Sequence, residues 1–217
     1  MLTIDIETIP TQNEFIQKHV LENIEADGRL KNPEKITADM AKKSEKAIHS
    51  TGLSGLFGQV LCVGIAQDDH DPICVYNTTG EDNLLADVRS LICPERQHTK
   101  TPSDYCAQTL VGHNVSAFDV PFLSQRMMVN GLPPLFKHGS KPWDLTVEDT
   151  MLQFACGTRN FYSLDDLCLA FGVDSPKGEL DGSKVYEYYM AGRHDEIKEY
   201  CIRDVVATRE VYRRMNR

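Results

Sequence analysis

The sequence predicts one α/β domain in which helices flank a mixed central β-sheet. Segments with strand patterns follow one another early in the chain and then alternate with helical segments, an order typical of such a sheet. The 217 residues, of which 41% are hydrophobic, suffice for one substantial core but hardly for two. We therefore expect a single domain over residues 1–217, with a helical and loop insertion at about residues 11–58.

The first strand is expected at the N-terminus, where apolar and polar residues alternate. Alternation places Leu2, Ile4 and Ile6 on one face and brings Asp5 and Glu7 together on the other. Two neighbouring carboxylates repel each other unless a cation lies between them, and Mg²⁺ or Mn²⁺ prefers such oxygen ligands. An exposed strand with two surface acids explains this segment alone equally well.

The polar segment that follows is expected to form two helices, at residues 13–24 and 37–48, with Thr37 as the cap of the second. Connections of this length often respond to substrate. Three lysines of the second helix fit a solvated face better than a contact with phosphate: Lys42, Lys43 and Lys46.

Later elements are expected from their periodicity and from the turn residues between them. An apolar strand at 59–66 is expected to be central and to form an antiparallel hairpin with a strand at 73–76. The rest are, in order, a helix at 83–92, a polar loop at 94–103, a strand at 110–113, a helix from about 119 to 131, a short strand at 143–145, and helices at 151–155, 164–171, 185–190 and 194–215.

Two further acids occupy informative positions. Asp119 begins a predicted helix, where an ordinary N-terminal cap is the simplest explanation. Asp204 lies inside the apolar stripe of the last helix, one turn after Tyr200. A carboxylate on a buried stripe needs a metal or an ion pair with an arginine, and a tyrosine there is usually packing.

In order along the chain, three segments resemble the three sequence motifs of the DEDD 3′–5′ exonucleases: Asp5-Ile6-Glu7, Asn114 to Asp119, and Tyr200 to Asp204. The tyrosine four residues before the last acid is similar to that of the Y-type branch, because the other branch has histidine where this chain has Glu199. Residues 175–185 and 199–208 extend the resemblance to stand-alone relatives of the proofreading exonuclease domain of family B DNA polymerases.

The resemblance implies a ribonuclease-H-like fold and a two-metal site. Asp5, Glu7, Asp119 and Asp204 would hold two divalent cations, Mg²⁺ or Mn²⁺, roughly 3.5–4 Å apart, and Tyr200 would orient the attacking water. The expected substrate is the 3′ end of single-stranded DNA or a frayed duplex end, and the product is a 5′-mononucleotide. Substrate contacts are expected at Thr8, Ile9, Asn114, Phe118, Lys177 and Lys184.

Two alternatives remain open. Enzymes of the same class also trim RNA, including short oligoribonucleotides, and no residue identifies itself as a contact to the 2′-hydroxyl. A catalytically silent nucleic-acid-binding module is the second alternative, although all four acids are present.

Composition limits the other function classes. A net charge of −9 argues against passive coating of nucleic acid. Seven cysteines without a Cys-x-x-Cys pair make a zinc ribbon unexpected and fit a reducing compartment. No apolar run is long enough to span a membrane, and no secretory signal is recognisable. We therefore expect a cytoplasmic protein; the sequence indicates neither protein partners nor an oligomeric state.

Overall fold

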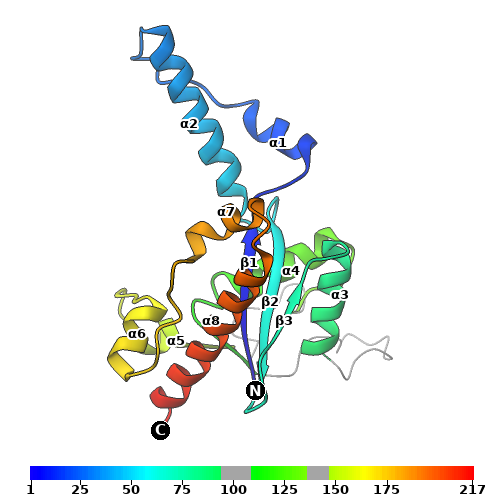
Figure 1. Ribbon diagram of the computed structural model, residues 1–217, viewed down its shortest axis with the longest axis vertical. Coiled ribbons are helices and arrows are strands. Elements are labelled where there is room, and N and C mark those ends of the chain that lie inside the picture. The colour runs from blue at the N-terminus through cyan, green and yellow to red at the C-terminus, as the bar shows by residue number, and fades with distance from the viewer. Residues whose placement is uncertain (94–108, 136–146) are drawn as a thin grey trace.

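The computed structural model describes residues 1–93, 109–135 and 147–217, and it contains a five-stranded mixed sheet (Figure 1). The strands are β1 (Leu2–Ile9), β2 (Gln59–Gln67), β3 (Ile73–Tyr76), β4 (Leu110–Gly112) and β5 (Val147–Asp149), in the spatial order β3-β2-β1-β4-β5. The β2–β3 hairpin is antiparallel, as predicted, whereas β1 pairs in parallel with β4. As its apolar sequence predicts, β2 lies inside the sheet between β1 and β3, and β1 is the middle strand.

Helices cover both faces of the sheet. They are α1 (Glu14–Leu21), α2 (Pro33–Thr51), α3 (Glu81–Ile92), α4 (Asp119–Val129), α5 (Thr150–Ala155), α6 (Leu164–Phe171), α7 (Val185–Met190) and α8 (His194–Met215); a 3₁₀ turn, Gly182–Lys184, precedes α7. The predicted loop at 94–103 and strand at 143–145 lie outside the described residues.

The alternation of β1 separates two cores. Leu2, Ile4 and Ile6 pack against α3 and α4 in the larger core. Ile9 packs on the opposite face, against residues of β2, α7 and α8. The face of β1 that carries Asp5 and Glu7 is therefore the face that α8 covers.

The first two helices project beyond the end of the sheet as an arm (Figure 1). The second of them, α2, begins at Pro33 and not at Thr37, because Asn32 caps it and proline suits a first helical position. Its C-terminal end is fastened to the chain just after β1: the Thr8 hydroxyl donates to the Gly52 carbonyl at 2.7 Å, and the Thr11 amide donates to Thr51 Oγ1 at 2.9 Å.

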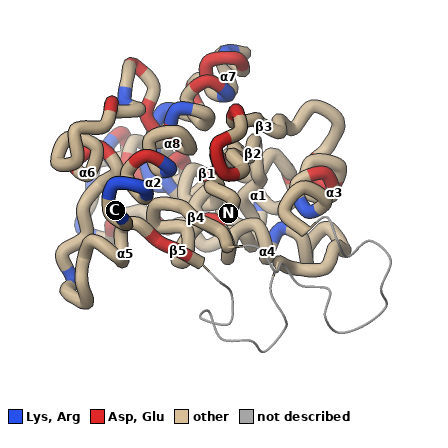
Figure 2. The backbone as a smooth tube through the Cα atoms, turned by 90° about the horizontal axis from the view of Figure 1, so that it is seen from below, with Lys and Arg blue, Asp and Glu red and all other residues tan. Residues whose placement is uncertain are grey.

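A buried ion pair joins α3 to α4. Arg126 Nη2 lies 2.6 Å from Glu81 Oε2, and both side chains are less than a tenth exposed. Glu81 also accepts from the Val60 amide of β2 at 2.8 Å. Elsewhere, acidic and basic residues are interspersed over the helices (Figure 2). Within the described part of the chain, no helix has the length and apolarity to cross a bilayer.

Candidate active site

The last helix comes very close to the sheet beside Asp5. Asp5 pairs with Gly64 of β2, and a Cβ at Gly64 would lie only 2.7 Å from Val205 and 2.9 Å from Cys201 of α8. Any other residue at Gly64 would push α8 away. The Cys201 thiol donates to the Asp5 carboxylate at 3.8 Å, which links the first motif directly to the last helix.

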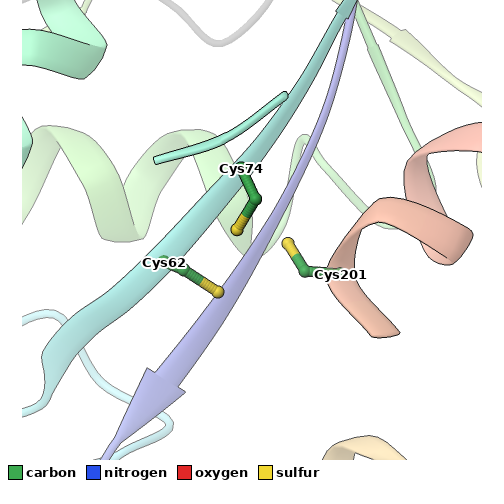
Figure 3. Close-up of side chains that lie close together, drawn as sticks. All are labelled: Cys62, Cys74 and Cys201. Carbon is green, nitrogen blue, oxygen red and sulfur yellow. The ribbon is translucent and has the colours of Figure 1, made fainter. Parts of the chain in front are cut away.

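Three cysteine sulfurs fill the space behind this contact. The sulfur atoms of Cys62, Cys74 and Cys201 lie within 4.8 Å of one another, between the sheet and α8 (Figure 3). Cys62 and Cys201 are fully buried and Cys74 partly so. The thiols pack as small apolar groups and keep α8 close to β1.

Asp119 belongs to the same site and is not an ordinary helix cap. Phe118 occupies the cap position of α4, and the Asp119 carboxylate accepts from the Ile6 amide of β1 at 3.0 Å. Asp119 is only 4% exposed. Its carboxyl is thus held beside the two acids of the first strand.

The loop before Asp119 is held by an acid that the sequence motifs do not include. Asp149, at the end of β5, accepts from the amides of Asn114 and Ser116, each at 3.0 Å, and from the Ser116 hydroxyl at 2.6 Å. Asn114 has a φ of 60°, an unfavourable conformation for most residues that asparagine tolerates. Asp149 therefore positions the second motif.

The remaining two residues come from one face of α8. Tyr200 and Asp204 are 9% and 8% exposed, lie one turn apart on the helix, and both line the same cavity. Neither the Asp204 carboxylate nor the other three forms an ion pair with lysine or arginine among the described residues. The alternative of a structural salt bridge at Asp204 therefore finds no support there.

Burial opposes ionisation of the four site carboxyls, those of Asp5, Glu7, Asp119 and Asp204. It raises the pKa of Asp5 and Glu7 well above their ordinary values, and repulsion from neighbouring acids raises them further. Burial also raises the pKa of Asp119 to about 7 and that of Asp204 to about 6. The pKa of Tyr200 is raised as well, mainly by burial, so its hydroxyl stays protonated. A bound cation is the simplest way to keep four such acids charged at neutral pH.

All five residues line one cavity of about 510 Å³. The cavity is also lined by Thr8, Asn114 and Phe118, as expected for substrate contacts. The other wall is formed by the C-terminal end of α2 with the turn after it, and by the 3₁₀ turn with the start of α7. These contribute residues that the motifs did not predict: Lys46, His49, Ser50, Leu53, Gly182, Ser183 and Tyr186.

Three expected substrate contacts lie elsewhere. Ile9 is 3% exposed and packs in the core, so it presents little surface to a base. Lys177 pairs with Asp165 at 3.1 Å, and Lys184 donates to the Glu179 carbonyl at 2.7 Å. The structure therefore does not bring these three into the cavity, because local packing and local charge already engage them.

The donor set fits hard divalent cations. Carboxylate oxygens from Asp5, Glu7, Asp119 and Asp204 converge on one partly open cavity, and oxygen-rich sites of this kind suit Mg²⁺ or Mn²⁺. Ligand atoms of Asp5 and Glu7 already lie within 4.8 Å of each other. We expect the four acids to act as the ligands.

Comparison with known proteins indicates both fold and family. Residues 100–217 match a family model described as a predicted 3′–5′ exonuclease related to the exonuclease domain of PolB. The structure is similar to that of the family B DNA polymerase from the hyperthermophilic archaeon Pyrobaculum calidifontis, with a TM-score of 0.60 and 16% identity over 99% of this chain. This chain spans 24% of that polymerase chain. No curated protein matches the sequence. The predicted α/β, ribonuclease-H-like fold is confirmed.

Proposed function

This chain belongs to the family of predicted 3′–5′ exonucleases related to the exonuclease domain of PolB, and on that premise we propose that it is a cation-dependent 3′–5′ exonuclease acting on single-stranded DNA or frayed 3′ ends. It would hydrolyse the terminal phosphodiester bond and release a 5′-mononucleotide. The observation that carries the proposal is the arrival of four carboxyls from β1, α4 and α8 in one cavity, at the positions of the three motifs.

We infer that Asp5, Glu7, Asp119 and Asp204 hold the cations. Bound there, two divalent ions would activate a water molecule and stabilise charge on the departing 3′ oxygen. The raised pKa values of the buried acids support this assignment, because each carboxylate gains a partner when a cation binds. Cation binding and proton release are expected to be coupled.

Tyr200 is proposed to orient the attacking water. Its hydroxyl is a protonated donor beside Asp204, and it lines the cavity. A protonated phenol can accept from a water and point it without acting as the base. Removing the hydroxyl should therefore slow the reaction and leave cation binding intact.

The terminal nucleotide is proposed to contact the wall formed by Thr8, Asn114 and Phe118. Phe118 lies at 5.5 Å from the ring of Phe122, tilted by 44°, and still lines the cavity. An aromatic edge in that position can contact the last base. The Thr8 hydroxyl is engaged by the Gly52 carbonyl, so Thr8 is expected to act through its backbone.

One digestion experiment tests the proposal and separates DNA from RNA. Matched 5′-labelled DNA and RNA oligomers, single- and double-stranded, are incubated with Mg²⁺, with Mn²⁺ or with a chelator. We expect ladders that shorten from the 3′ end, released 5′-mononucleotides and no reaction with the chelator. Faster RNA shortening would favour the exoribonuclease alternative, and no release with either cation would favour a silent binding module.

Two variants localise the activity. Asp5→Ala and Asp204→Ala should abolish nucleotide release while circular dichroism shows an unchanged fold. Asp195→Ala is a matched control, because Asp195 lies on the same helix as Asp204 but its side chain is 91% exposed. Full activity in both site variants would remove these acids from the mechanism.

A further inference from the structure

The second helix carries a basic face that leads out of the cavity. We propose that this basic face, formed by Lys35, Lys42, Lys46 and His49, binds the sugar-phosphate backbone of the strand whose 3′ end enters the cavity. The inference rests on the proposed function, because that function supplies the strand. It adds a binding site on the arm, beyond the acids and the cavity wall.

Spacing along α2 places the four side chains together. From Lys35 the steps are seven, four and three residues, and residues so spaced share one face of an α-helix. Lys35, Lys42, Lys46 and His49 are all exposed. None of the three lysine ammonium groups forms an ion pair within the described part of the chain. Their charges are therefore available to an external anion.

The acids of the helix do not cancel this face. Asp39 lies within this face, but it is engaged: it pairs with Lys43 at 2.9 Å and accepts from the Asp27 amide at 2.8 Å. Glu34 precedes Lys35 and points about 100° away from it around the helix. Glu45 lies one turn from both Lys42 and His49, so it offsets part of the charge, but the face keeps three lysines against this one acid. Lys43 also donates to the Glu25 carbonyl at 3.0 Å, which ties the arm together without using the basic face.

The basic face is continuous with the cavity. Lys46 and His49 line the cavity, whereas Lys42 and Lys35 lie farther out along the projecting helix (Figure 1). Eleven residues separate Lys35 from Lys46, which corresponds to about 16 Å along the axis. A strand leaving the cavity along α2 would meet positive charge over that length.

Charge and aromatic contacts both favour a nucleic-acid strand as the occupant. The whole chain has a net charge of −9, and the cavity concentrates four acids, so phosphates need local cations to approach. His49 meets Tyr186 edge-on at 5.2 Å, and Tyr186 stacks near Tyr189 at 6.3 Å. Cationic grooves beside aromatic rings are the usual means of holding a single strand.

Binding of a fluorescent DNA 20-mer to the full chain tests the inference. Anisotropy is measured across a salt series in the Asp204→Asn background, which removes hydrolysis from the assay. Lys35→Gln/Lys42→Gln deletes two contacts, so the slope of log affinity against log salt should fall by about 1.4, and affinity at 0.1 M salt should fall roughly 25-fold. A trinucleotide, too short to reach Lys35, should show no difference.

Arg159→Gln/Arg217→Gln is the matched control, because it removes two exposed positive charges far from the arm. We expect it to keep the affinity and slope of the parent. Equal affinity and slope for Lys35→Gln/Lys42→Gln would overturn the inference, as would an equal loss in the control, which would indicate a general charge effect.

The experiments distinguish failure of the exonuclease proposal from failure of the basic-face proposal. Release of mononucleotides by the unmodified chain, with no binding defect in the lysine variant, would remove the basic face and leave the exonuclease. A binding defect without nucleotide release in any metal would remove the exonuclease and leave a strand-binding arm.

Discussion

Replacing Asp204 by asparagine should stabilise the cation-free protein at pH 8 and change little at pH 4. Asp204 is 8% exposed, and burial raises its pKa from 3.8 to about 6. That difference, at 1.36 kcal/mol per pH unit, corresponds to about 3 kcal/mol. Asparagine keeps the shape of the side chain but carries no charge.

The folded-state and unfolded-state pKa values of Asp204 decide whether stability rises or falls with pH. Because the folded-state pKa is the higher one, the contribution of Asp204 to stability is fully present below pH 3.8 and is lost as the pH rises through about 6. The unmodified protein should therefore lose about 3 kcal/mol from this group between pH 4 and pH 8, and the variant should not. Asp119, with a pKa of about 7, adds a loss of the same sign to both proteins.

Urea unfolding followed by circular dichroism measures the difference. Both proteins are unfolded with a chelator at pH 4, 6 and 8, and again with Mg²⁺ at pH 8. We expect the variant to be the more stable without cation at pH 8, and the unmodified protein to gain more from Mg²⁺, because only it retains all four proposed ligands. Asp87→Asn, at an exposed position on α3, is the control and should follow the unmodified protein.

Parallel stability curves for Asp204→Asn and the unmodified protein would refute the reasoning. That outcome would mean that the Asp204 carboxyl is solvated in the folded chain when the cation is absent, so that burial does not raise its pKa.

Three other substitutions probe the surroundings of the site. Tyr200→Phe should lower kcat roughly tenfold to hundredfold by misdirecting the water, with unchanged cation affinity by calorimetry. Asp149→Ala should lower the free energy of unfolding by about 3 kcal/mol and also lower kcat, because it leaves the Asn114 and Ser116 amides without their acceptor. Arg126→Met should cost about 3–5 kcal/mol in urea unfolding, because Glu81 stays buried without its partner.

For each of these three substitutions, one outcome would contradict the prediction. Unchanged turnover in Tyr200→Phe would remove that hydroxyl from the mechanism. Unchanged turnover in Asp149→Ala, at a reduced stability, would make Asp149 a folding residue only. Arg126→Met/Glu81→Gln should cost less than Arg126→Met alone, and an equal cost would show that the ion pair is not the source of the effect.

The sequence predicted the elements whose apolar and polar residues repeat regularly along the chain. The alternation in β1 correctly separated its apolar face from its acidic face. The last helix, His194–Met215, has the predicted bounds because its apolar stripe is long and regular. The start of α2 was missed because a cap at Asn32 followed by proline is a short signal inside a polar segment.

The sequence predicted some residues of the candidate site, and only the structure shows the others. Its acids stand in ordered motifs, so the sequence alone identified the residues that now line one cavity. Lys177 and Lys184 have neighbours that engage their charges, and only the folded chain reveals those neighbours. Asp149 and Lys46 belong to no motif. Asp149 accepts from backbone amides 33 and 35 residues away. Lys46 reaches the cavity because α2 is fastened at its C-terminal end.

The contact between Cys201 and Asp5 joins groups 196 positions apart. During synthesis the first strand therefore leaves the ribosome long before the helix that completes its ligand set. Until that helix docks over Gly64, a nascent chain has the acids of β1 and Asp119 of α4 but lacks Asp204, so the cavity is incomplete. The site is thus completed last at the place where its chain begins, and the proposed exonuclease activity would have to wait until translation of the domain is nearly finished.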